Sequence, residues 1–126
     1  MGVRLTACVT TQGTCAVVTL GGYIDVSTHK QLQEVLAGAC RGVSHLVIDM
    51  SRLEFMDSTG LTVLIEAYRR LDARGATLDL AAPQPIVAKV LEISGLDQVF
   101  RVHASLLQAV TRATGEGEPA APMTDL

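Results

Sequence analysis

The beginning of the chain alternates between apolar and polar residues, which is the pattern of β-strands. Apolar side chains occupy every second position of residues 3–9, and residues 14–20 form a second run rich in β-branched residues. Residues 11–13 between them suit a turn, so the two runs predict an antiparallel hairpin. Gly21 and Gly22 follow the second run, and we expect them to end it.

Further along, four segments space their apolar residues at i, i+3 and i+4, which places them on one face of a helix. Thr28 and Gln31 have the spacing of a capping box at the start of the first helix. Ser105 and Gln108 repeat that spacing at the start of the last. The predicted helices lie between residues 28 and 42, 61 and 75, 85 and 94, and 105 and 113.

Three more strands separate these helices. Residues 45–50 contain an uninterrupted apolar run, so we expect a central strand that is covered on both faces. Residues 77–80 alternate as a strand does, and residues 100–102 suit a short edge strand. This order predicts an α/β domain with a mixed, mostly parallel sheet, an N-terminal antiparallel hairpin and about four packed helices.

The length of the chain fits one domain. Its 126 residues, 48% of them hydrophobic, suffice for one compact core and leave no room for a second domain. We assign residues 1–113 to this domain. Residues 114–126 mix Gly, Pro, Ala and acidic residues without periodicity, so we expect a flexible C-terminal tail.

Charge and hydropathy exclude several classes of partner. The net charge is -3 and the ten Lys and Arg residues are scattered, so no basic stripe is available for nucleic acid. No stretch approaches the roughly 18 apolar residues of a membrane-spanning helix, and residues 1–10 lack the pattern of a signal peptide. We therefore expect a cytoplasmic protein that binds neither nucleic acid nor membranes.

The cysteines and histidines give no sign of a metal or redox site. The three cysteines, Cys8, Cys15 and Cys40, follow no metal or disulfide spacing and are expected to be reduced thiols. The three histidines also lack the spacing of metal ligands. We expect no metal and no cofactor.

Two strand-to-helix junctions, residues 21–28 and 51–60, are candidate functional sites, because open α/β sheets bind ligands at the carboxyl ends of their strands. In the second junction Asp57, Ser58 and Thr59 precede Gly60. Each of the three can cap a helix, and capping alone would explain any one of them. From the residues alone, helix capping is the favoured interpretation. The combination of two hydroxyls, a carboxylate and a glycine nevertheless raises the case for a functional role, with Gly60 permitting close approach of another surface.

The residues of this junction and the two lysines do not match the motifs of enzyme classes that use the same residue types. Asp57 leads into a strong helix, unlike the paired loop of an aspartic protease. Ser58 is not in a Gly-x-Ser-x-Gly elbow, and neither lysine follows a phosphate-binding glycine loop. A phospho-acceptor receiver domain would need an acidic pair after the first strand and a Lys after the last strand, and this sequence has neither. We therefore expect a binding protein and not an enzyme.

The residues match a known family at this point. Leu46-Val47-Ile48-Asp49-Met50-Ser51, followed by Phe55-Met56-Asp57-Ser58-Thr59-Gly60-Leu61, resembles the signature of STAS-domain anti-sigma factor antagonists. Gly22-Tyr23-Ile24-Asp25 looks like the family's first strand-to-helix turn. The segment from Val90 to Asp97, followed by Phe100, looks like its third helix and the loop after it. Together these stretches cover about residues 3–113.

The resemblance implies a bacterial regulator whose unphosphorylated form binds an anti-sigma factor and thereby frees a sigma factor. In this family the anti-sigma factor is a serine kinase of the histidine-kinase-like ATPase fold. It inactivates the antagonist by phosphorylating a serine that corresponds to Ser58 here, with Thr59 as the rival acceptor. A separate serine phosphatase restores the active form. The alternative is a STAS scaffold subunit of a stress-sensing complex.

The resemblance also implies where the partner binds. Tyr23 departs from the family, which often has an acidic residue at that position, and this bears on which partner is recognised. The expected partner-binding residues, which surround both junctions, are Gly22, Tyr23, Asp25, Ser27, Asp57, Ser58, Thr59 and Gly60.

Overall fold

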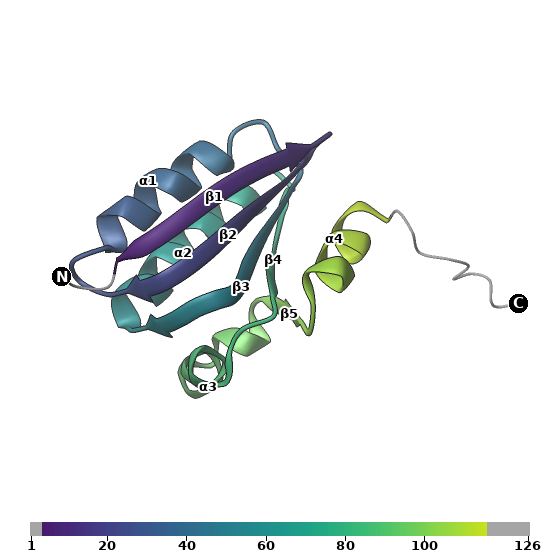
Figure 1. Ribbon diagram of the computed structural model, residues 1–126. Helices are drawn as coiled ribbons and strands as arrows, with labels where there is room; N and C mark the ends of the chain where they lie inside the picture. The colour runs from purple at the N-terminus through teal and green to yellow at the C-terminus, as the bar shows by residue number, and fades with distance from the viewer. Residues whose placement is uncertain (1–3, 116–126) are drawn as a thin grey trace, which may run out of the picture.

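The computed structural model describes residues 4–115. Strands and helices alternate along most of this length (Figure 1). In chain order the elements are β1 (Leu5–Gln12), β2 (Cys15–Ile24), α1 (His29–Ala39), β3 (His45–Met56), α2 (Ser58–Asp72), β4 (Thr77–Ala81), α3 (Pro85–Ser94), the 3-10 turn η1 (Leu96–Gln98), β5 (Arg101–His103) and α4 (Leu106–Thr114).

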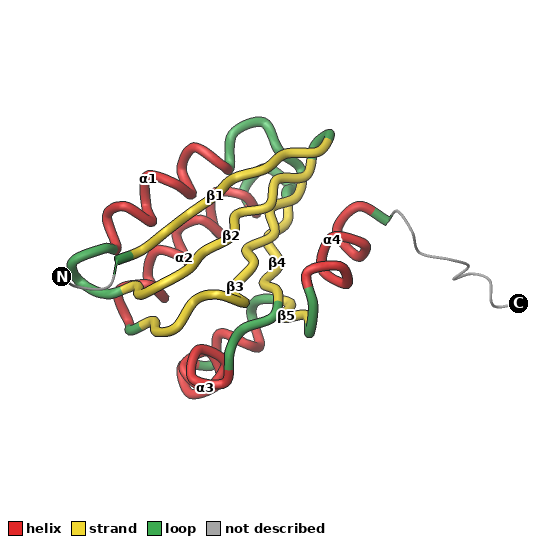
Figure 2. The backbone as a smooth tube through the Cα atoms, in the orientation of Figure 1, coloured by secondary structure: helices red, strands yellow, loops and turns green. Residues whose placement is uncertain are grey.

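The five strands form one sheet in the order β1-β2-β3-β4-β5. β1 pairs antiparallel with β2, and every other neighbouring pair is parallel. The predicted fold class is confirmed, including the N-terminal hairpin and the four helices. The helices α1 and α2 lie behind the sheet in Figure 2, α4 lies on the opposite side, and α3 lies beyond the lower ends of the strands.

Helices cover both faces of the central strand, as its apolar run predicts. Ile48 belongs to the larger apolar cluster, which α1, α2 and α3 close with Leu36, Leu64 and Leu91. The next residue towards the N-terminus, Val47, points to the other face, because successive side chains of a strand alternate. There it packs in a smaller cluster with Ala109 of α4 and other buried residues, Cys15 and Ala81.

The second strand continues through the two glycines that were expected to end it. Gly22 has φ +89°, and a Cβ on it would lie 1.9 Å from the carbonyl oxygen of Arg4. Only glycine therefore lets β2 pass this close to the backbone of the neighbouring segment. The register between β2 and β3 shifts before Gly21 and again after Gly22, so the two glycines make an irregularity within the strand and β2 ends at Ile24.

The first predicted capping box is wrong. The hydroxyl of Thr28 donates to the carbonyl of Tyr23 at 2.9 Å and accepts from the N–H of Asp25 at 3.0 Å. It thus closes the loop before α1 and does not cap the helix. Gln31 donates from Nε2 to the carbonyl of Leu5 at 3.0 Å, away from the helix start.

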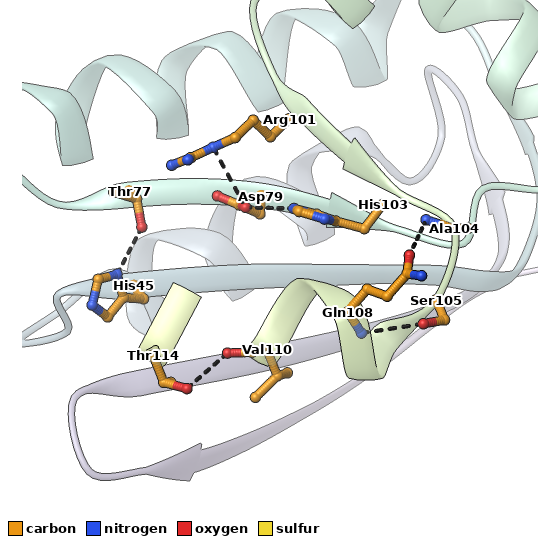
Figure 3. Close-up of polar contacts among 10 residues, drawn as sticks. All are labelled: His45, Thr77, Asp79, Arg101, His103, Ala104, Ser105, Gln108, Val110 and Thr114. Carbon is orange, nitrogen blue, oxygen red and sulfur yellow. Dashed lines mark hydrogen bonds and ion pairs between the residues drawn. The ribbon is translucent and has the colours of Figure 1, made fainter. Parts of the chain in front are cut away.

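The last predicted capping box is confirmed in its main contact (Figure 3). The Oγ of Ser105 accepts from the N–H of Gln108 at 3.1 Å, and Gln108 Oε1 accepts from the N–H of Ala104, one residue before the cap, at 3.2 Å. α4 includes Thr114, one residue beyond the predicted domain. The predicted tail from residue 116 onwards lies outside the described residues. None of the helices between residues 4 and 115 is long and apolar enough to cross a membrane.

Candidate functional site

The two candidate junctions meet at the carboxyl ends of β2 and β3. Ile24 and Met56, the last residues of these strands, are register partners. One residue further on, the N–H of Asp57 donates to the carbonyl of Ile24 at 3.2 Å. This bond ties the start of α2 to the loop before α1, so the residues after both strands form one surface.

Asp57 is the N-cap of α2. Its Oδ1 accepts from the backbone N–H of Thr59 at 2.9 Å and also from the hydroxyl of Thr59. A carboxylate at this position is stabilised by the positive end of the helix dipole. The cap therefore occupies both the carboxylate of Asp57 and the hydroxyl of Thr59.

Ser58 differs from its two neighbours. It is the first residue of α2 and its side chain is exposed. Within residues 4–115 the hydroxyl of Ser58 makes no hydrogen bond. Its backbone carbonyl accepts one from Thr62 Oγ1 at 3.2 Å. Of the two neighbouring hydroxyls at this helix start, the one on Ser58 is open to a reagent in solution.

Gly60 is buried, and it brings the helix close to the strand ends. A Cβ at this position would lie 2.6 Å from Met56 Cγ and 2.8 Å from Ile24 Cγ2. The close approach expected at Gly60 is thus made by the protein's own side chains. Gly22 is likewise packed against its own chain, beside Arg4.

The loop after β2 contributes a negative charge. Asp25 Oδ1 accepts from the hydroxyl of Ser27 at 2.7 Å and from its N–H at 2.9 Å. These two hydrogen bonds from Ser27 lower the pKa of the Asp25 carboxyl below its usual 3.8. The next residue, Val26, is 73% exposed.

An aromatic pair adjoins the two loops. The rings of Tyr23 and Phe55 lie with their centroids 5.7 Å apart, on neighbouring positions of β2 and β3. Strand alternation places them on the face opposite to Ile24 and Met56. Phe55 and Val26 adjoin the predicted partner-binding residues but were not among them. The position of Phe55 directly across from Tyr23 follows only once the strand register is known.

We call the accessible part of this region the Ser58 surface. Its residues, all at least partly exposed, are Tyr23, Asp25, Val26, Ser27, Phe55, Asp57, Ser58 and Thr59. The described part of the chain holds no group of three or more His, Cys, Asp or Glu residues that could bind a metal ion. The Ser58 surface offers an acceptor hydroxyl, two carboxylates and exposed apolar side chains, which is the chemistry of a modifiable binding surface.

A second polar cluster lies on the α4 side of the sheet, away from this surface (Figure 3). Asp79 in β4 is buried, and its Oδ2 lies 2.7 Å from Nε2 of His103 and 3.7 Å from Nε of Arg101 in β5. The only sign of this cluster in the sequence is a polar residue at every second position of each strand. It joins β5 to the rest of the sheet.

Comparison with other proteins identifies the family of this chain. Residues 7–109 match the STAS domain family. The anti-sigma-F factor antagonist RsfB of Mycobacterium tuberculosis is 30% identical over 101 residues, which are 79% of this chain and 82% of that protein.

Two solved proteins share the fold closely. The crystal structure of an anti-sigma factor antagonist from Mycobacterium paratuberculosis has a TM-score of 0.83 at 28% identity, covering 88% of this chain and 95% of that one. Bacillus SpoIIAA in its phosphorylated form has a TM-score of 0.67 at 25% identity, covering 85% and 98%. Its unphosphorylated form has a TM-score of 0.76 at 26% identity, covering 87% and 97%. The chain therefore belongs to the STAS domain family, and its relatives include anti-sigma factor antagonists.

Proposed function

We propose that this protein is an anti-sigma factor antagonist controlled by phosphorylation of Ser58. In its unphosphorylated form it binds an anti-sigma factor that is also a serine kinase, and this binding frees a sigma factor. The kinase ends the interaction by phosphorylating Ser58, and a serine phosphatase reverses the change. The observation that carries the proposal is the exposed, unbonded hydroxyl of Ser58 at the start of α2.

The helix start favours Ser58 over Thr59 as the acceptor. Phosphoryl transfer requires the serine oxygen to attack the γ-phosphorus of ATP while its proton passes to a base of the kinase and ADP leaves. The hydroxyl of Ser58 can rotate into this position freely. The hydroxyl of Thr59 already donates to Asp57, so its attack would first require breaking that hydrogen bond.

The added phosphate is compatible with the folded domain. A phosphoserine brings about -1.5 to -2 charges at pH 7. At the first residue of a helix, unpaired backbone N–H groups and the helix dipole stabilise negative charge. We therefore expect the free protein to keep its fold after phosphorylation.

Partner binding responds differently to the same charge. In an interface the phosphate must lose water next to the Asp57 carboxylate, one residue away. The loop that carries the Asp25 carboxylate is joined to the same helix start by the Asp57–Ile24 backbone hydrogen bond. An uncompensated charge in such a place costs several kcal/mol, and each 1.4 kcal/mol is about a tenfold loss of affinity. SpoIIAA, a relative with the same fold, exists in phosphorylated and unphosphorylated forms, which supports this proposal.

Parallel pull-downs with wild type and Ser58→Ala test the proposal. Both should retain the same kinase, and after addition of ATP only the wild type should be released. Thr62→Ala is the matched control, because Thr62 also has an exposed side chain on the first turns of α2. Phosphopeptide mapping should place the phosphate on Ser58. Phosphate on Thr59 alone would contradict the proposal, and a large assembly containing many copies would favour a scaffold subunit.

A further inference from the structure

The two edge strands of the sheet are built differently. β5 has three residues, and two of them, Arg101 and His103, carry polar groups that pair with Asp79. β1 has eight residues, Leu5–Gln12, with no charged residue and no proline. It pairs with β2 in unbroken register, without a bulge. Natural edge strands are protected from pairing by short length, charge, proline or bulges, and β1 has none of these devices.

The outer edge of β1 offers backbone groups for pairing. Gln12 and Cys15 flank a two-residue turn and therefore form a hydrogen-bonded pair. Because bonded and non-bonded pairs alternate in an antiparallel ladder, the odd-numbered residues of β1 direct their N–H and C=O groups away from β2. The carbonyl of Leu5 is taken by Gln31 Nε2. The groups of Ala7, Val9 and Thr11 remain open along the edge.

The side chains of β1 fit a second copy of the same strand. When two β1 strands run antiparallel with Cys8 on the two-fold axis, Ala7 faces Val9 of the other copy and their backbone groups exchange hydrogen bonds. On the opposite face of the sheet, Thr6 lies across from Thr10 of the other copy, and such Thr–Thr pairs stabilise sheets through hydroxyl contacts. No charged residue opposes a like charge, because β1 carries no charge.

We propose that two copies of this protein associate through their β1 edges, forming a continuous ten-stranded sheet with Cys8 at the two-fold axis. The contact is isologous, because the same residues are used by both copies, so it closes as a dimer and does not propagate. The Ser58 surface stays free in this dimer, since it lies at the ends of β2 and β3 and not along the outer edge of β1.

Sedimentation velocity of the full chain over a range of concentrations tests the association. We expect the mass to double as concentration rises. Val9→Lys should keep the protein monomeric, because the dimer would then bring two positively charged lysines, one from each copy, to either side of the two-fold axis. The matched control is Val102→Lys on the other edge strand, where the valine is 39% exposed compared with 43% for Val9. This control should dimerise as the wild type does, and thermal unfolding should show that both variants fold.

Disulfide formation at Cys8 gives an independent test of the register. In the proposed dimer the two Cys8 residues form a non-hydrogen-bonded pair with Cα atoms about 4.5 Å apart, a distance that a disulfide spans. Diamide accepts two electrons and two protons from the two thiols as the S–S bond forms. Cys8 is exposed while Cys15 and Cys40 are buried, which makes the reaction specific.

The control for collision is Cys8→Ser combined with Val102→Cys, which exposes one thiol on the opposite edge. We expect the wild type to form a covalent dimer faster than this variant at equal concentration. A monomer at every concentration, together with equal rates of disulfide formation, would overturn the proposal. Dimerisation that persists in Val9→Lys would overturn it as well, since the contact would then lie elsewhere.

Discussion

The Nε2 of His103 lies 2.7 Å from Oδ2 of Asp79, and this contact links the edge strand β5 to β4 on the face of the sheet that α4 covers. The side chain of Asp79 is only 1% exposed, and its second oxygen, Oδ1, has no hydrogen-bond partner among residues 4–115. Burying a carboxylate is costly unless it is paired. The stability of this end of the domain therefore depends strongly on the single close partner of Asp79.

We predict that His103→Ala lowers the free energy of unfolding by about 3 kcal/mol, because it leaves the buried Asp79 carboxylate without its closest partner. Urea denaturation measures this value. Arg101→Ala should cost at most about 1 kcal/mol, since the Arg101 side chain is half exposed and its Nε is 3.7 Å from Asp79. Adding Asp79→Asn to His103→Ala should restore part of the loss. Equal effects of the two single substitutions would show that the charge of Asp79 is not the cause.

Gly60→Ala should lower the stability by about 1–3 kcal/mol, because the new methyl group collides with the Met56 and Ile24 side chains. Gly38→Ala is the matched control, since Gly38 lies in α1 with nothing within 4 Å of a built Cβ. It should stabilise the protein by about 0.5–1 kcal/mol through helix propensity. Thermal unfolding measures both changes. If Gly60→Ala leaves stability unchanged but weakens partner binding, Gly60 contacts the partner after all.

Asp25→Lys should weaken binding of the kinase at least about tenfold, because it reverses the charge of a carboxylate that the lowered pKa keeps ionised. The free energy of unfolding should stay nearly unchanged, as for other surface substitutions. Calorimetric titration and urea denaturation measure the two effects. Ser27→Ala is the control, since it removes one hydrogen bond to Asp25 and keeps the charge. Lost stability with unchanged affinity would show that Asp25 serves only to order the loop.

The charge of Asp25 also has a pH dependence with a definite sign. Its carboxyl pKa is lower in the folded protein than the ordinary 3.8, so the loop bonds from Ser27 stabilise the fold fully above that pH. This contribution is lost as the pH falls from 3.8 through the lowered folded value. In Asp25→Asn the corresponding segment of the acid unfolding curve should be flatter. An unchanged curve would mean that the Ser27 bonds do not distinguish the charged carboxylate.

Deleting residues 116–126 should leave folding and kinase binding unchanged. The apolar clusters of the described domain draw on residues up to Ala113 of α4, and the Ser58 surface lies on β2, β3 and the helix starts that follow them. Thermal unfolding and pull-down of the shortened protein measure the two properties. Aggregation of the shortened protein, or loss of its partner, would show that the tail packs on the domain.

The sequence predicted those parts of the fold that rest on local patterns. The apolar run Leu46-Val47-Ile48 identified the central strand, and the helical spacing within α2 and α3 located both helices. Gly22 misled the prediction, because its conformation is needed where β2 passes close to Arg4, a contact between segments that no local pattern contains. Thr28 was misassigned for a different reason: its hydroxyl bonds the carbonyl of Tyr23, five positions earlier, and so closes the preceding loop instead of capping the helix.

The candidate site could likewise be predicted from the sequence only in part. The cluster of Asp57, Ser58 and Thr59 was visible in the sequence as a helix start. Which of the two hydroxyls stays unbonded depends on the rotamer of Asp57 and required the structure. The pairing of Asp79 with His103 joins residues 24 positions apart and has no sequence signature.

The hydrogen bond from the Asp57 N–H to the Ile24 carbonyl joins the backbone at the start of α2 directly to the loop that carries Asp25. If Ser58 is phosphorylated as we propose, a change at the start of α2 can reach the Asp25 loop through this one bond, without a rearrangement of the core. The Asp57 amide is therefore a natural reporter. Its hydrogen-exchange rate measures whether the two loops remain joined, separately from whether the domain is folded.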